Sequence, residues 1–265
     1  MRPQMRLALL FSAVVALLAL SGRPAAAYSP LGYPGSMWGN FYREFDGLEG
    51  TGIQGHVTQG VDWFKLPLGV TCDTFGGYNW RFRTLNKDYF NAHGPEVGMV
   101  LKKGPIGVGA DFVWLYYPEL RRTSRDFAFF ADWYETWNIA KALGAPSWHG
   151  HAVRGLPLTT WGRMSHDLNA TEGQGSQGWV KQGIHWIDLP YKVGLVTYGS
   201  YNWRVRSKNR PYYNTHGPSA GLSLEQRYVN LGLEYAWRNF PELQRSTRSL
   251  QLYLTWYFDW DLKKR

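Results

Sequence analysis

Two copies of one motif place pairs of arginines two residues apart. Residues 78–83 read Tyr-Asn-Trp-Arg-Phe-Arg, and residues 201–206 read Tyr-Asn-Trp-Arg-Val-Arg. Residues two apart in a β-strand share one face, and a guanidinium group fits carboxylate or phosphate with a planar fork of donors. A strand carrying this motif would therefore present Arg81, Arg83, Arg204 and Arg206 either to an anionic ligand or to acidic side chains such as Asp111, Asp132, Glu234 and Asp259.

The segments after these motifs also repeat. Residues 86–95 and 209–218 each carry Tyr, Asn and His ahead of Gly-Pro, and Gly-Pro favours a turn. Aromatic and amide side chains in such loops could hold a sugar by stacking and hydrogen bonding. A rigid capping loop with satisfied histidines is the alternative. One histidine per loop without further ligands predicts no metal site. The candidate ligand contacts are Tyr89, Asn91, His93, Tyr212, Asn214 and His216.

A third repeated segment is basic. Pro-Glu-Leu at 118–120 returns at 241–243, and each copy is followed by arginines. A basic rim of this kind would face phosphate-rich lipopolysaccharide or an acidic polymer. The alternative is solvated charge paired with the local glutamate. The arginines concerned are Arg121, Arg122, Arg125, Arg245 and Arg248.

These repeated motifs belong to one tandem duplication. Residues 32–139 align with residues 155–262 at a constant offset of 123, and 41 of the 108 aligned pairs are identical by our count. A unit of this length is too long for a solenoid repeat. The two copies therefore form either two domains or two halves of one closed structure.

The N-terminus and the composition indicate an exported protein. Residues 1–27 contain Arg2 and Arg6, an apolar run and a final Ala-Ala-Ala, which predicts a signal peptide cleaved near Ala27. Cys72 is the only cysteine, so no internal disulfide can form. The net charge of +9 is spread along the chain and predicts no nucleic-acid partner. Fourteen tryptophans and 17% aromatic residues suit a protein that meets two membrane interfaces.

The period of the apolar pattern is two. From Leu250 to Leu262 apolar and polar residues alternate over thirteen positions, and no apolar run long enough for a transmembrane helix follows the signal. Each copy yields about six such segments, in the first copy near 38–45, 53–66, 69–83, 96–103, 106–117 and 125–139. Their connections alternate between tight turns and longer loops. The pattern predicts an all-β fold, a closed antiparallel transmembrane barrel of about twelve strands.

This layout resembles the general class of twelve-stranded outer-membrane β-barrels. The alternating aromatics of the last strand are similar to the pattern read by barrel-assembly machinery, although 263–265 depart from it. The resemblance implies a Gram-negative outer-membrane location, with outer-membrane lipid and lipopolysaccharide as partners. Residues 28–265 would then form a single barrel, with repeat one at 32–139, a periplasmic connector at 140–154 and repeat two at 155–262.

The class hosts several functions, so the fold alone selects none. We expect a channel or conduit favouring anionic solutes or acidic oligosaccharides. One alternative is a non-transporting barrel that serves as an assembly or adhesion platform for an exported polymer or partner protein. The other is a soluble periplasmic protein of two β domains that binds carbohydrate. His216 stands near Ser219 and Asn214, but repeat one has Glu96 in place of Ser219 and no third group orients a base. The sequence therefore predicts no enzyme and no cofactor.

Overall fold

The computed structural model describes residues 30–139, 155–168 and 173–264. The expected signal peptide and the connector at 140–154 lie outside these residues. The described chain contains four single-turn 3₁₀ helices, none of them long and apolar enough to cross a membrane. Its twelve strands are β1 (Pro34–Glu44), β2 (Thr51–Lys65), β3 (Thr71–Arg83), β4 (Ala92–Lys103), β5 (Ile106–Tyr117), β6 (Arg122–Asn138), β7 (Pro157–Asp167), β8 (Gln174–Leu189), β9 (Val193–Arg206), β10 (Thr215–Gln226), β11 (Val229–Phe240) and β12 (Arg245–Asp261).

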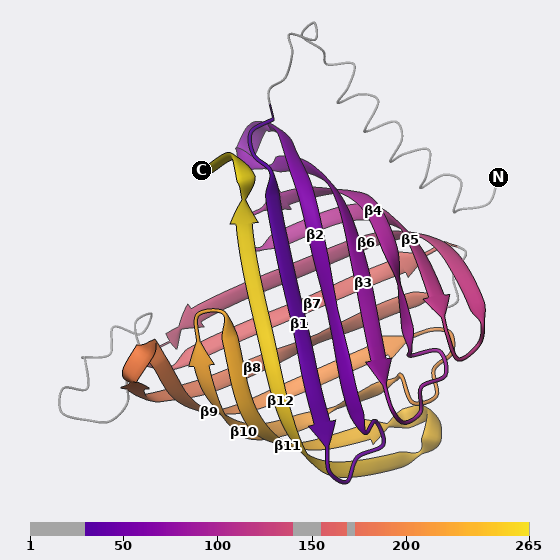
Figure 1. The fold of residues 1–265 in the computed structure, drawn as a ribbon, viewed down its shortest axis with the longest axis vertical. Coiled ribbons are helices and arrows are strands. Elements are labelled where there is room, and N and C mark those ends of the chain that lie inside the picture. Colours follow the sequence, from indigo (N-terminus) through magenta and orange to yellow (C-terminus); the bar gives the residue numbers. More distant parts are fainter. Residues whose placement is uncertain (1–29, 140–154, 169–172, 265) are drawn as a thin grey trace, which may run out of the picture.

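The twelve strands form one closed antiparallel barrel. Each strand pairs with its neighbours along the chain, and β1 pairs with β12 from Pro34↔Asp261 to Glu44↔Gln251. Figure 1 shows the steep strands β1 to β3 crossing in front of β7 to β9, as two walls of a barrel with tilted strands do. The expected closed barrel is confirmed. A single closed sheet leaves no place for the alternative of two separate six-stranded domains.

Connections at the two ends of the barrel differ in length, in most cases as the sequence predicts. At one end the strands are joined by turns of two to five residues, which lie at 66–70, 104–105, 190–192 and 227–228. At the other end the described connections have four to eight residues, at 45–50, 84–91, 118–121, 207–214 and 241–244, and those at 118–121 and 241–244 are shorter than expected. We call these the short-turn end and the long-loop end. Strand β1 starts and β12 finishes at the short-turn end, so both ends of the barrel chain lie there (Figure 1).

Strand β4 begins earlier than expected, because its Gly-Pro is not a turn. Gly94 and Pro95 pair with β3, but pairing with β5 skips from His93↔Tyr116 to Glu96↔Val113. A Cβ at Gly94 would lie 1.7 Å from the backbone oxygen of Trp114, so only glycine lets the two backbones approach this closely. Proline has no N–H to donate toward β5. The Gly-Pro step is therefore a local defect inside a strand.

Polarity is reversed relative to a water-soluble protein. The outer face exposes large apolar side chains, among them Leu231 (44%), Leu250 (40%) and Leu252 (37%). The inner face buries charged groups, such as Asp111 (2%) and Glu96 (4%). Charged residues are almost never fully buried unless paired, and large exposed apolar areas mark an interaction with another phase or molecule. The barrel is thus built for an apolar environment outside and a polar one inside.

Tryptophan rings on the outer face cover glycines of neighbouring strands. Trp256 of β12 lies over Gly39 of β1, so close that a Cβ on this glycine would lie 2.1 Å from the ring. Trp80 of β3 covers Gly55 of β2 in the same way. A glycine that faces an aromatic ring across two strands recovers the packing that its missing side chain would supply. These pairs contribute to holding adjacent strands in register.

Candidate functional site in the barrel lumen

The four arginines of the repeated motif lie on the lumen side near the long-loop end. Alternation along β3 and β9 points Arg81, Arg83, Arg204 and Arg206 inward, and three of them (Arg81, Arg204 and Arg206) line the lumen cavity described below. Arg83 and Arg206 are the last residues of their strands and are both 4% exposed. The structure therefore brings the four predicted residues to one end of one compartment.

Their main acidic partner is Glu49 from the β1–β2 loop. Its Oε1 accepts hydrogen bonds from Arg83 Nη1 at 2.6 Å and from Arg204 Nη2 at 2.5 Å, and Arg238 Nη1 lies 3.2 Å from its Oε2. Arg238 also pairs with Glu44 at the end of β1. We call these five residues the Glu49 cluster. The carboxylates that the sequence suggested as partners are not the ones that hold Arg83 and Arg204.

Electrostatics in this cluster favour the charged carboxylate. Burial works against ionisation of Glu49, but the guanidinium groups of Arg204, Arg238 and Arg83 outweigh it and hold the pKa of this carboxyl well below its usual range. Three cations around two carboxylates leave an excess of positive charge. The cluster is therefore a cross-link between strands from both repeats and a locally basic surface.

Two aromatic rings that the sequence analysis missed pack on the arginines. The Arg83 guanidinium lies 4.1 Å from the ring centre of Phe90, and the Arg206 guanidinium lies 3.7 Å from that of Tyr213. Arg204 lies near both rings, at 5.4 and 5.0 Å. Such cation–π contacts favour a cation over the aromatic face. The rings that pack on the arginines are thus Phe90 and Tyr213, each one residue after a predicted contact, Tyr89 or Tyr212.

Among the predicted loop contacts, the two asparagines hold the loop to its strand. Asn91 accepts from the Arg83 backbone N–H at 2.7 Å and donates to its carbonyl oxygen at 3.1 Å, and Asn214 does the same with Arg206 at 2.8 and 3.1 Å. Tyr89 and Tyr212 each adopt a left-handed conformation with φ of 56°. The geometry of these four residues suits the rigid capping loop.

The two histidines are not loop residues. His93 and His216 lie in β4 and β10, on the outer face, where their Nδ1 atoms contact the hydroxyls of Tyr78 at 2.5 Å and Tyr201 at 2.9 Å. The prediction that they lie in a ligand-binding loop is wrong, since the strands begin before the Gly-Pro step. They point away from the lumen.

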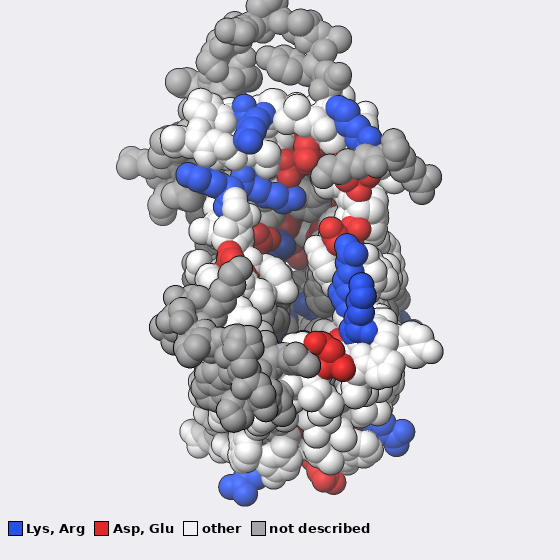
Figure 2. All heavy atoms as spheres, turned by 90° about the vertical axis from the view of Figure 1, so that its left-hand side faces the viewer, with Lys and Arg blue, Asp and Glu red and all other residues white. Residues whose placement is uncertain are grey.

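A cavity of about 940 Å³ occupies the lumen next to the Glu49 cluster. Side chains of β1 to β9 and β12 line it, and Figure 2 shows a face of the barrel hollowed at its centre, with acidic groups inside the hollow. Nine carboxylates line it, against five Lys and Arg side chains. The carboxylates are Asp62, Asp73, Glu96, Asp111, Asp126, Asp132, Asp167, Asp259 and Asp261. The described lining of the cavity is therefore predominantly acidic.

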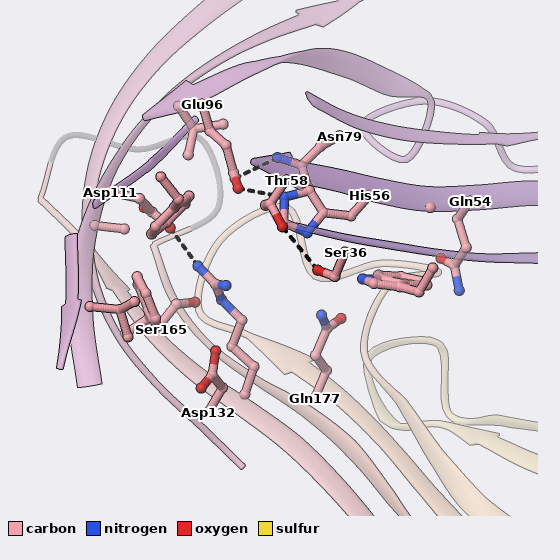
Figure 3. Close-up of a pocket in the computed structure, with 18 of the residues that line it drawn as sticks. Ser36, Gln54, His56, Thr58, Asn79, Glu96, Asp111, Asp132, Ser165 and Gln177 are labelled. Atoms are coloured by element: carbon pink, nitrogen blue, oxygen red, sulfur yellow. Dashed lines mark hydrogen bonds and ion pairs between the residues drawn. The ribbon is translucent and has the colours of Figure 1, made fainter. Parts of the chain in front are cut away.

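Two hydrogen-bonded sets form the middle of the cavity wall. Glu96 accepts from Asn79 Nδ2 at 2.6 Å and lies 2.5 Å from His56 Nε2, while Arg163 Nη2 donates to Asp111 at 2.5 Å. In Figure 3 Glu96, Asp111, Asp132 and Gln177 all border the same open space. These groups offer carboxylate, amide and imidazole contacts to a polar solute.

A cluster of tyrosines lies elsewhere in the lumen. Tyr42, Tyr198 and Tyr253 form a buried cluster, with the Tyr198 and Tyr253 rings 6.5 Å apart. The two repeats differ here at aligned positions, because Tyr198 and Tyr253 replace Phe75 and Phe130, and Ser219 and Trp179 replace Glu96 and His56. The cavity thus lies mainly against the strands of repeat one.

The arrangement suits binding or passage of a charged or polar solute. Within the described ranges no group of three or more His, Cys, Asp or Glu residues could hold a metal ion. The sequence analysis missed Glu49, Glu44, Arg238, Phe90 and Tyr213. Glu49 stands in a Glu-Gly-x-Gly segment that recurs in the sequence at 172–175, and the inward fold of the loop at 45–50 follows from tertiary packing that no local pattern encodes.

Among known proteins, the chain is similar only in fold, to solved structures of low sequence identity. No protein-family model matches the chain, and no curated protein matches it. Among solved structures, the β domain of the Bordetella autotransporter BrkA is 14% identical with a TM-score of 0.35, covering 84% of this chain and 98% of that one. An outer-membrane channel from Pseudomonas putida F1 is 6% identical with a TM-score of 0.36, covering 90% and 100%. A bacterial polysaccharide outer-membrane secretin is 9% identical with a TM-score of 0.37, covering 88% and 99%.

Proposed function

We propose that this protein is an integral outer-membrane barrel that acts as a narrow conduit for polar solutes. The observation that carries the proposal is the reversed polarity, with an apolar outer face and a lumen that holds a charged, 940 Å³ cavity. A closed sheet leaves no unpaired edge in lipid, which is a requirement for spanning with strands. Twelve strands give a lumen between the side-chain-filled eight-stranded barrels and the wide pores of sixteen.

The charge distribution of the lumen refines the expected anion preference. The Glu49 cluster and Arg81 and Arg206 give the long-loop end a basic surface, which favours anionic solutes or the acid groups of an oligosaccharide. The carboxylates toward the short-turn end favour cations. We therefore expect the conduit to select anionic groups at one end only, which suits a solute carrying both signs of charge.

The test is conductance of the purified protein in planar bilayers. A pore with opposite charge at its two ends should pass more current in one direction than in the other, and the difference should shrink as salt screens the charges. Asp259→Asn, at an exposed lumen position of the short-turn end, should reduce the difference. Glu135→Gln, on the outer face of the same end, is the matched control and should leave the current unchanged. Equal, unselective current in both directions would contradict the two-signed lumen.

A second candidate function has one specific observation in its favour. The Glu49 cluster and the tyrosine cluster both lie inside the barrel, which suits a closed barrel that serves as an assembly or adhesion platform. Glu49→Gln would release the cluster and should raise the conductance of a conduit. No current from either the native protein or Glu49→Gln would refute the conduit and favour the platform.

A further inference from the structure

The outer face carries a polar row at the long-loop end, once in each repeat. In repeat one it comprises Tyr78, His93, Trp114 and Arg125, on β3 to β6, and in repeat two Tyr201, His216, Trp237 and Arg248, on β9 to β12. All four positions keep the same residue in both repeats. In this the rows differ from the lumen, where aligned positions have changed. His56 and Glu96 of repeat one correspond to Trp179 and Ser219 of repeat two.

Strand register and Tyr–His contacts bring members of each row together. Trp114 lies directly opposite Arg125 in the β5–β6 ladder, and Trp237 lies opposite Arg248 in the β11–β12 ladder. Each histidine contacts its tyrosine hydroxyl through Nδ1. In repeat two, Asn239 Nδ2 lies 3.2 Å from His216 Nε2, and Ser246 donates to Asn239 at 3.2 Å. In repeat two, hydrogen bonds thus connect polar groups of β9 to β12 through Tyr201, His216, Asn239 and Ser246.

The rows lie at the edge of the apolar belt that is nearest the long-loop end. Arg125 and Arg248 are exposed, and the next outward residues along each strand are Phe127 and Leu250. A charged side chain on the lipid side is tolerated near an interface and disfavoured at mid-membrane depth, and tyrosine and tryptophan prefer the headgroup level. If the barrel spans a membrane as proposed, each row therefore lies among lipid headgroups of the leaflet at the long-loop end.

We propose that each row is a binding site for the phosphate of a phosphorylated outer-leaflet lipid. Arginine pairs with phosphate through its donor fork, and the neighbouring tyrosine, histidine and tryptophan supply hydroxyl and ring N–H groups suited to phosphate or sugar oxygens. Charge complementarity selects an anionic headgroup, because the exposed charges of both rows are positive. The site depends on the membrane location and is independent of whether the lumen conducts.

The test measures lipid bound to the whole purified protein in detergent. The probe is lipid A with two phosphates, and the comparison lipid is the same molecule with both phosphates removed. Native mass spectrometry should show up to two phosphorylated lipids bound per barrel. Arg125→Gln with Arg248→Gln should weaken binding about fivefold at each site. His93→Gln with His216→Gln should also weaken binding, because it removes the imidazoles from both sites.

The matched control removes two charges from the opposite end, with Lys65→Gln and Lys103→Gln, both exposed near short turns. This variant should bind lipid A as the native protein does. Equal loss in the control and in the double arginine variant would reduce the effect to net charge and overturn the proposal. Equal binding of the dephosphorylated lipid would overturn it as well, since acyl chains alone would then suffice. If the protein sediments with membranes but fails these binding tests, the lipid site is refuted while the proposed conduit still stands.

Discussion

Glu49→Gln is the substitution with the largest expected effect on the lumen. The Glu49 carboxylate is 4% exposed and has contacts to Arg83, Arg204 and Arg238 at 2.6, 2.5 and 3.2 Å. Removing one partner of a buried ion pair leaves uncompensated charge and costs roughly 3–5 kcal/mol. Three guanidinium groups would remain near Glu44 alone, so we expect a loss near the upper part of that range.

The assay is equilibrium unfolding in urea with the protein in detergent, followed by tryptophan fluorescence and by heat-modifiable mobility on gels. Asp46→Asn is the matched control, because Asp46 is exposed in the same loop and the substitution changes the same charge. It should change the free energy of unfolding by less than about 0.5 kcal/mol. A loss below 1 kcal/mol for Glu49→Gln would refute the idea that the cluster ties the two repeats together.

Acid should reproduce the effect of this substitution. The pKa of Glu49 is held well below its ordinary value of 4.5 by the three arginines. A carboxyl whose pKa is lowered on folding contributes stability that is fully present above its unfolded pKa and decreases as pH falls toward the folded pKa. The native protein should therefore lose stability below about pH 4.5, and Glu49→Gln should lose less over the same range.

Three further outcomes follow from the strand geometry. Leu254→Arg, on the outer face near the middle of β12, should cost about 2–4 kcal/mol and impair membrane insertion, whereas Thr255→Arg in the lumen should be tolerated; equal tolerance in an insertion assay would reverse the face assignment. Residues 28–150 alone should aggregate or pair into a homodimeric barrel, because their sheet would keep two open edges; a stable monomer in sedimentation would contradict this. Gly94→Ala should destabilise the barrel by on the order of 3 kcal/mol in urea unfolding, since its Cβ would lie 1.7 Å from a backbone oxygen of β5, while Gly76→Ala, whose Cβ would lie 3.9 Å from its nearest neighbour, should not.

The sequence predicts the barrel well because its signal is periodic and duplicated. Alternation over β12 and β9 assigns their two faces, and Leu254 and Thr255 lie where that alternation places them. Turn positions also agree, since Leu66-Pro67 and Gly104-Pro105 end strands at short connections. The start of β4 was predicted about four residues too late, because Gly94-Pro95 indicated a turn. The same dipeptide occurs in turns and in strand defects, and only the neighbouring backbone distinguishes the two.

The site is predicted in part. The two-residue spacing of the arginines indicates their shared lumen face, and the structure places them there. Their partner could not be predicted, because Glu49 lies on a loop far from Arg204 in the chain and reaches it only after the sheet closes. The ring that covers each arginine belongs to Phe90 or Tyr213 because the left-handed backbone of the preceding tyrosine turns the chain, which the residue types alone do not show.

The seam between β1 and β12 has a consequence for how the barrel is assembled. All other strand pairs join neighbours along the chain, so they close much shorter loops than the seam does, at lower entropic cost. The seam joins the first strand to the last, and before it forms both carry unpaired backbone groups that would pair with any available strand. Trp256 over Gly39 and Trp260 over Gly35 bring large rings onto this junction. We therefore expect closure of this seam to be the slowest step in forming the barrel, complete when the two tryptophan rings pack on their glycines.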